Sequence, residues 1–211
     1  MLKLSEPLDD GIETSLGTFK LNLAYNKVLQ WYEMVERDDM TMTEKLRAGW
    51  YIFIDDEYEP TTADDYEAVA TTLQEISQYI AHDPYMSNES SGQDDDTQFS
   101  PVSWFSYEKD AEAIYASFLF DYQIDLIDMQ DEMRWEKFRA LFNNLSAKSP
   151  IMRIIDIRQT DITKYEGKDQ ADIVEAQAYY QLESATVEQL NNSFTDMFSM
   201  LTNMAKENPN T

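Results

Sequence analysis

The side chains most often used in catalysis are scarce in this sequence and stand apart from one another. His82 is the one histidine among 211 residues, and cysteine is absent. A catalytic histidine needs a nucleophile or an orienting carboxylate beside it, and the sequence pattern indicates neither for His82. The five glycines form no phosphate-binding loop and no dinucleotide fingerprint. We therefore expect a protein that is not an enzyme and that binds no cofactor.

Asp94-Asp95-Asp96 is the sequence feature that most resembles a metal site. A calcium loop needs ligands at spaced positions, a glycine at the turn and a closing glutamate, whereas these three aspartates are consecutive. Paired acids elsewhere, such as Asp9-Asp10, reflect the general abundance of acidic residues. We therefore expect no metal site.

The charge balance narrows the choice of partners. Asp and Glu number 41 and Lys and Arg number 16, which gives a net charge of -25 and a pI near 4.1. Contact with nucleic acid needs clustered basic side chains, so we expect no nucleic-acid ligand. Two explanations of the charge stay open. One is solubility and mutual repulsion, and the other is attraction of a basic or aggregation-prone partner, including mimicry of nucleic acid.

Nothing in the sequence predicts export or membrane insertion. No stretch approaches the roughly 18 apolar residues of a membrane span, and Met1-Leu2-Lys3 opens no signal peptide. The lack of cysteine suits a reducing compartment. We expect a cytoplasmic protein with no membrane contact.

The elements that would position these residues are mostly helical. Only residues 8–23 alternate between apolar and polar side chains, at Phe19, Leu21 and Leu23, which predicts a short strand or a small hairpin. Apolar residues recur every three or four positions through most of the remaining chain. The expected fold class is therefore mainly α, a helical bundle with a small N-terminal β element.

Local signals mark several helix starts. Thr41 and Glu44 form a capping box before one helix, and Ser149 followed by Pro150 is typical of another start. Gly167 predicts a break before a further helix. The stripes with helical spacing cover residues 25–35, 46–53, 66–80, 111–122, 135–145, 151–155 and 173–180.

The helical pattern stops between residues 83 and 103. Residues 87–96 include no apolar and no basic side chain, which predicts a flexible acidic linker or a long loop. We therefore expect four parts along the chain. They are an N-terminal helical part with a short β element (1–82), the linker (83–103), an aromatic-rich helical part (104–183), and a C-terminal amphipathic helix with a polar tail (184–211).

The C-terminal helix is the candidate partner-binding surface. Flexible methionine side chains beside aromatic rings suit a surface that must accept varied hydrophobic segments. The alternative is that the same stripe closes the core, and the sequence leaves both interpretations open. The residues of the stripe are Phe194, Met197, Phe198, Leu201 and Met204.

Six stretches between residues 104 and 158 carry a family resemblance. They are Phe105, Tyr107-Glu108-Lys109-Asp110-Ala111, Ile114-Tyr115-Ala116-Ser117-Phe118, Tyr122-Gln123-Ile124-Asp125-Leu126, Trp135-Glu136-Lys137-Phe138-Arg139-Ala140-Leu141 and Ile154-Ile155-Asp156-Ile157-Arg158. Their order and spacing resemble a family of tailed-phage and prophage proteins of Gram-positive hosts. The genes of that family lie between those of the major tail protein and the tape-measure protein. The residues expected to form the buried structural core of the motif, where two adjacent helices pack, are Tyr115, Phe118, Tyr122, Trp135, Phe138 and Leu141.

The resemblance implies a tail-assembly chaperone or adaptor that binds the phage tape-measure protein. The tail-tube protein is a second implied partner, and the implied location is the cytoplasm of an infected or lysogenic host. Two alternatives remain: a structural tail or connector component of the virion, and an acidic DNA-mimicking inhibitor. Many acids fall in the predicted linker and at helix starts rather than along one face, which disfavours the inhibitor. The sequence does not indicate an oligomeric state.

Overall fold

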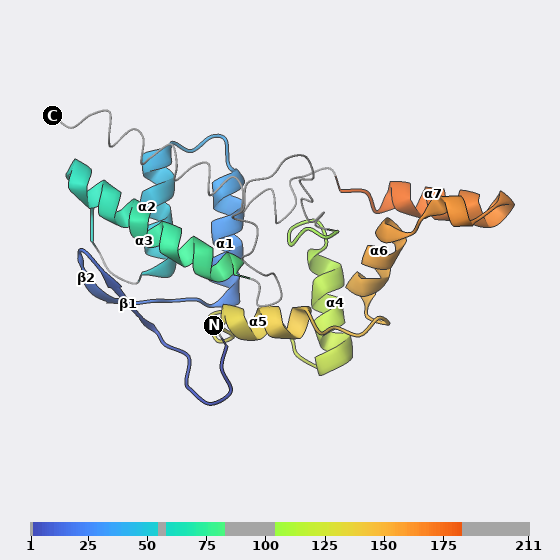
Figure 1. Ribbon diagram of the computed structural model, residues 1–211, viewed down its shortest axis with the longest axis horizontal. Helices are drawn as coiled ribbons and strands as arrows, with labels where there is room; N and C mark the ends of the chain where they lie inside the picture. Colours follow the sequence, from blue (N-terminus) through green and yellow to red (C-terminus); the bar gives the residue numbers. More distant parts are fainter. Residues whose placement is uncertain (1, 55–57, 83–103, 183–211) are drawn as a thin grey trace, which may run out of the picture. The chain divides into compact units, whose positions relative to one another are not determined.

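The computed structural model describes residues 2–54, 58–82 and 104–182 (Figure 1). Within these ranges the chain forms seven α-helices, one 3-10 helix and one two-stranded antiparallel sheet. The predicted mainly α fold with a small N-terminal β element is therefore confirmed. The predicted linker 83–103 and the predicted C-terminal helix within 184–211 lie outside the described residues.

The described chain forms two compact units. Unit 1 holds residues 2–23, 30–54 and 58–82, and unit 2 holds residues 24–29 and 104–182. Helix α1 (Tyr25–Glu36) therefore begins in unit 2 and ends in unit 1. A short segment from the first half of the chain thus packs with the second half.

The β element of unit 1 is a hairpin of β1 (Gly11–Thr14) and β2 (Gly17–Lys20), as the alternating pattern predicts. Gly17 has a φ of +134°, a conformation that side chains with a Cβ rarely adopt. Phe19 extends from β2 and packs edge-on against Trp50, with ring centroids 5.1 Å apart. The hairpin is thereby attached to the helical core of its unit.

Both remaining helices of unit 1 begin with reciprocal caps. These helices are α2 (Met42–Phe53) and α3 (Ala63–Ala81). At α2 the Glu44 N–H donates to the Thr41 hydroxyl and the Thr41 N–H donates to the Glu44 carboxylate at 2.7 Å, which confirms the predicted capping box. Thr62 and Asp65 form a second capping box at α3.

Close packing of α2 in unit 1 depends on a glycine. Trp31, Trp50 and Phe53 are fully buried in this core. A Cβ at Gly49 would overlap the Trp31 ring and lie 3.0 Å from the Leu73 Cδ1. Gly49 therefore allows the indole of Trp31 to lie directly on the helix backbone.

Unit 2 is built from the remaining helices, which follow the predicted stripes. They are α4 (Ala111–Tyr122), α5 (Trp135–Phe142), α6 (Pro150–Gln159), the 3-10 helix η1 (Ile162–Lys164) and α7 (Gly167–Tyr179). Helix α4 is followed by its C-cap residue Gln123, which has a left-handed backbone with a φ of 56°. Gly167 has a φ of +61° at the start of α7.

The start of α6 is capped from another helix. Pro150 occupies the first turn as predicted, but the Ser149 side chain makes no capping hydrogen bond. Instead the Ile151 N–H donates to the Ser117 hydroxyl of α4 at 2.9 Å. The Ser117 hydroxyl in turn donates to the Ala113 carbonyl at 2.6 Å. The helix therefore starts where the sequence predicts, with Ser149 as the N-cap residue and Pro150 in the first turn, but a hydroxyl of α4 accepts the backbone N–H that an N-cap side chain usually binds.

Stacked aromatic rings join α4 and α5. Phe138 lies nearly parallel to Phe118 of α4, with ring centroids 5.1 Å apart and planes inclined by 9°. It also stacks on Tyr25 at 4.9 Å and on Trp135 at 5.5 Å. Phe118, Trp135 and Phe138 are almost completely buried, as expected for the structural core of the motif.

The other three residues of the expected motif core lie at its edge. Tyr115, Tyr122 and Leu141 are half-buried rather than buried, so this part of the expectation is wrong. The physical reason for the tyrosines is their hydroxyl groups, which reach polar partners at the rim. The Tyr115 hydroxyl donates to the Asp125 carboxylate at 3.0 Å, and the Tyr122 hydroxyl lies 3.0 Å from the Leu141 carbonyl.

Candidate functional site

The described residues contain no cluster suited to metal chemistry. In residues 2–54, 58–82 and 104–182, no group of three or more His, Asp and Glu side chains could hold a metal ion. His82 is exposed directly after α3. Among the helices of the same ranges, none is long and apolar enough to cross a membrane.

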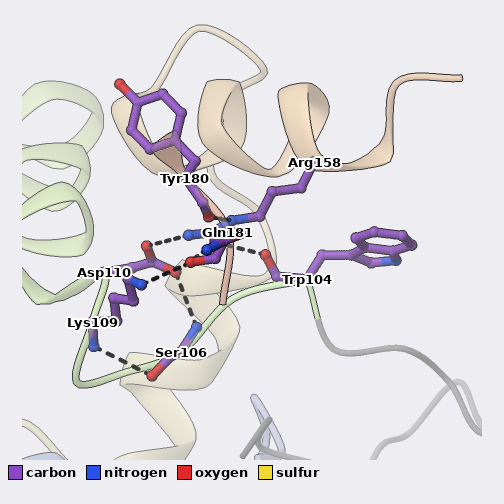
Figure 2. A network of polar contacts seen from close by, with 7 residues as sticks. All are labelled: Trp104, Ser106, Lys109, Asp110, Arg158, Tyr180 and Gln181. Carbon is purple, nitrogen blue, oxygen red and sulfur yellow. Dashed lines mark hydrogen bonds and ion pairs between the residues drawn. The ribbon is translucent and has the colours of Figure 1, made fainter. Parts of the chain in front are cut away.

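A buried ion pair between Asp110 and Arg158 forms the centre of a polar network in unit 2 (Figure 2). Both side chains are only 5% exposed. The Arg158 Nη1 and Nη2 atoms donate to Oδ2 and Oδ1 of Asp110 at 2.7 and 2.8 Å, so the pair is bidentate. Asp110 precedes α4 without capping it through its side chain, and its Oδ2 accepts the Ser106 N–H at 3.0 Å.

The same guanidinium binds the segment before α4 and the segment after α7. Its Nη1 also donates to the Trp104 carbonyl at 2.8 Å, and its Nε donates to the Tyr180 carbonyl at 2.6 Å. The Lys109 Nζ donates to the Gln181 carbonyl at 2.7 Å. Figure 2 shows Asp110, Trp104 and Tyr180 converging on Arg158, with the contact between Lys109 and Gln181 beside them. The segment that enters α4 and the segment that leaves α7 are therefore fastened to α6 at one point.

Asp110 and Arg158 act as a structural clamp. Removing two charges from water costs several kcal/mol, which only good geometry and additional hydrogen bonds can offset. Both carboxylate oxygens and all three guanidinium nitrogens already have partners. The arrangement therefore suits fastening the segments before α4 and after α7 to α6 better than binding a ligand.

Sequence reasoning missed this pair. Asp110 and Arg158 both belong to stretches that carry the family resemblance, but they lie 48 positions apart, and no spacing rule connects them. Arg158 follows Ile154, Ile155 and Ile157, but the exposed Asp156 lies in the same stretch. The local sequence therefore identifies neither the buried arginine nor the residue that it contacts.

Helix α4 exposes apolar side chains on the side away from the aromatic core. Ile114 and Phe118 are buried, whereas Leu119 is 46% and Phe120 is 61% exposed. The outer face of α4, which also carries the exposed Glu112, thus presents two large apolar side chains to solvent. Exposed apolar side chains mark interaction sites when they form a patch.

The turn after α4 carries a further exposed apolar residue. The Asp125 carboxylate accepts the Tyr115 hydroxyl through one oxygen at 3.0 Å and the Ile127 N–H through the other at 2.9 Å. Tyr115 lies one helical turn before Leu119 on α4. Ile127, which is 62% exposed, therefore lies in a turn that is anchored to the Tyr115 side chain. Leu119, Phe120 and Ile127 together are called the α4 surface below.

Hydrogen bonding to the Asp125 carboxylate also affects titration. It raises the pKa of the Tyr115 hydroxyl, because ionising the phenol would place a second negative charge against the carboxylate. The pKa of Tyr25 is raised as well, first by burial and then by the charges of Asp125 and Asp131. Both phenols therefore stay neutral hydrogen-bond donors near neutral pH.

The surroundings of the α4 surface are acidic. Residues 111–133 include six acidic residues and no basic one. Of these, Asp121 accepts hydrogen bonds from Ser146, and Asp131 pairs with Lys27 at 3.7 Å. The α4 surface thus combines exposed apolar groups with negative charge.

A second set of exposed apolar residues lies on η1 and α7. Helix α7 has no buried residue and packs against α6 and η1. The exposed side chains of this region are Ile162, Tyr165, Val174 and Tyr179. This region is less acidic, since Lys164 and Lys168 lie among its carboxylates.

The partner-binding residues expected from the sequence lie outside the part of the chain that the structure describes. They are Phe194, Met197, Phe198, Leu201 and Met204. Their role as a binding stripe or as core therefore stays a prediction. The apolar surface that the structure does describe is on α4, in the stretch that carries the family resemblance.

Comparison with known proteins adds one finding. A family model described as Bacteriophage Gp15 protein matches residues 4–182. This range includes every helix and strand of the described residues. A search of curated proteins and a search of solved structures each found no match.

Proposed function

We propose, from the premise that this chain belongs to the Bacteriophage Gp15 protein family, that it is a tail-assembly chaperone or adaptor for the phage tape-measure protein. The family makes it a bacteriophage protein with a structural or assembly-related role. The finer proposal is that it keeps the tape-measure protein soluble while tail-tube subunits assemble around it. This work takes place in the cytoplasm of the bacterial host and needs neither a catalytic site nor a cofactor.

The observation that carries the proposal is the α4 surface on a strongly acidic chain. A tape-measure protein is long and helical and has apolar stretches, which aggregate unless a partner covers them. The exposed Leu119, Phe120 and Ile127 supply apolar contact area, and burial of such area is the main driving force of association. The net charge of -25 would keep the resulting complex in solution.

The framework of unit 2 supports the same proposal. The clamp of Asp110 and Arg158 and the stacked pair of Phe118 and Phe138 hold α4 in place from its inner side. A binding surface on a rigid element loses less conformational entropy when a partner docks. A chaperone with a fixed surface can therefore hold a client without first folding around it.

The test is co-expression with the tape-measure protein encoded by the same phage. We expect the tape-measure protein to be insoluble when expressed alone and to co-purify with this chain when the two are expressed together. An unrelated protein of similar size and acidity serves as the control, because charge alone could raise solubility. A tape-measure protein that stays in the pellet, or that the control protein solubilises equally well, would contradict the proposal.

A structural role in the virion is the second candidate, and the coarse family assignment favours it equally. Mass spectrometry of purified phage particles separates the two. A chaperone is absent from the mature particle, whereas a tail or connector component is present in a fixed number of copies. Detection of this chain in stoichiometric amounts would replace the chaperone proposal with the structural one.

A further inference from the structure

We propose that the α4 surface is a docking site for a basic amphipathic helix, which lays its apolar face on Leu119, Phe120 and Ile127. This inference rests on the proposed function and deepens it by stating the chemistry of the client segment. The occupant is defined by an apolar stripe flanked by Lys or Arg side chains. Such helix-on-surface recognition is a common mode of binding between proteins.

The position of α4 leaves only its outer side available. Phe118 stacks on Phe138 of α5 at 5.1 Å on the inner side. Ser117, next to it, accepts the first free N–H of α6 from Ile151. The neighbouring residues Leu119 and Phe120 cannot reach that core, because successive side chains on a helix point about 100° apart. Leu119 and Phe120 are therefore the large apolar side chains that α4 leaves exposed in the part of the chain that the structure describes.

The charges around the α4 surface select the partner. Among the six acids of residues 111–133, Glu112, Asp128 and Glu132 are exposed and take part in no ion pair within the described chain. These carboxylates are available to pair with a basic client. Opposite charges around an apolar contact raise the association rate and exclude partners of the wrong charge.

The same charges disfavour a second copy of this chain as the occupant. Two copies docked through their α4 surfaces would bring together two segments, residues 111–133 of each copy, that contain six acidic residues and no basic one. Each chain also carries a net charge of -25. Like charges placed against one another oppose association, so a basic helix fits the surface and another acidic chain does not.

The binding test uses the full chain and two synthetic amphipathic helices of equal length and equal leucine pattern. One carries Lys on its polar face and the other carries Glu. Fluorescence anisotropy of the labelled peptides measures binding. We expect the Leu–Lys helix to bind, with an affinity that falls as salt is added, and the Leu–Glu helix not to bind. Equal binding of both helices would overturn the proposal.

Substitutions locate the binding site. Phe120→Ser should weaken binding of the Leu–Lys helix about tenfold or more. The matched control is Tyr51→Ser, which removes another exposed aromatic ring (52% exposed) from unit 1 and should leave binding unchanged. A double variant, Asp128→Asn with Glu132→Gln, changes only exposed charges and should reduce the salt dependence. If Phe120→Ser or the charge variant binds as the unmodified chain does, the site is not on α4.

Two outcomes separate this inference from the proposed function. If the Leu–Lys helix binds through Phe120 but co-expression leaves the tape-measure protein insoluble, the docking site stands and the chaperone role fails. If the Phe120→Ser chain solubilises the tape-measure protein as well as the unmodified chain does, the chaperone role stands and the α4 surface is not where the client binds.

Discussion

Replacing Arg158 by Met tests the clamp that closes unit 2. The substitution keeps much of the side-chain length and removes the charge and all the guanidinium donors. Asp110, whose side chain is 5% exposed, would then be a buried carboxylate without its ion-pair partner. The carbonyls of Trp104 and Tyr180 would lose their donor at the same time.

The expected loss follows from the geometry of the pair. Breaking a buried ion pair by removing one partner costs about 3–5 kcal/mol, because the remaining charge stays desolvated. The two contacts at 2.7 and 2.8 Å are bidentate and charge-assisted, which is the strong form of such a pair. We therefore expect the loss of stability to fall within this range. A loss of that size is a large fraction of the roughly 5–15 kcal/mol that stabilises a typical domain.

Chemical denaturation followed by far-UV circular dichroism measures the effect. The matched control is Arg153→Met, which changes an exposed arginine of the same helix α6 and should alter stability by less than about 0.5 kcal/mol. The double variant Asp110→Leu with Arg158→Met should be more stable than Arg158→Met alone, because it buries no unpaired charge. If Arg158→Met were as stable as Arg153→Met, the clamp would not be the buried ion pair described above. The same would follow if the losses of stability caused by Asp110→Leu and Arg158→Met simply added in the double variant.

Three other predictions concern the cores and the start of α3. Phe138→Ala should lower the free energy of unfolding by about 3–5 kcal/mol in a denaturant titration, since the ring stacks on Phe118 and on neighbouring rings; an unchanged midpoint would mean that the ring is not in the core. Gly49→Ala should cost about 1–3 kcal/mol, because the added methyl group overlaps the Trp31 ring, and a melting temperature equal to that of the parent would disprove this close approach. Hydrogen bonds from the backbone N–H groups of the two residues before α3 hold the pKa of Asp65 far below its ordinary value of 3.8. The stability that the ionised Asp65 carboxylate adds is therefore fully present above about pH 4 and is lost as pH falls further. The difference in melting temperature between the parent and Asp65→Asn should thus shrink in acid, and a constant difference would contradict this.

Local features of the fold could be predicted from the sequence because they depend on neighbouring residues. The capping box of Thr41 and Glu44 involves two groups three positions apart, and both the box and the helix that follows it are confirmed. The alternating residues near Phe19 likewise predict the hairpin, since a strand has a period of two. The helical spacing of apolar residues likewise predicts α3 and α4, and the structure confirms both helices.

Contacts between distant residues could not be predicted in this way. The true partner of the α6 start is Ser117 rather than Ser149, because the free N–H of Ile151 meets a hydroxyl from another helix. The contact between Asp110 and Arg158 likewise depends on how α4 and α6 assemble, because the two residues lie on different elements. A periodic pattern shows which face of a helix is apolar, but not which element covers that face.

The limits of periodicity also apply to the α4 surface. The apolar stripe over residues 111–122 predicts a helix with one buried face. The structure buries Phe118 and leaves Phe120 exposed. Only the placement of α5 and α6 against the inner side of α4 shows which side stays uncovered.

The most direct test of the chaperone role removes the gene from the phage in frame and follows the tape-measure protein in infected cells. We predict that the tape-measure protein then moves to the insoluble fraction, that no tails assemble, and that supplying the unmodified chain from a plasmid restores both. Supplying the Phe120→Ser chain should restore them only weakly. If the tape-measure protein stays soluble and tails of normal length assemble without this chain, the account of its function is wrong.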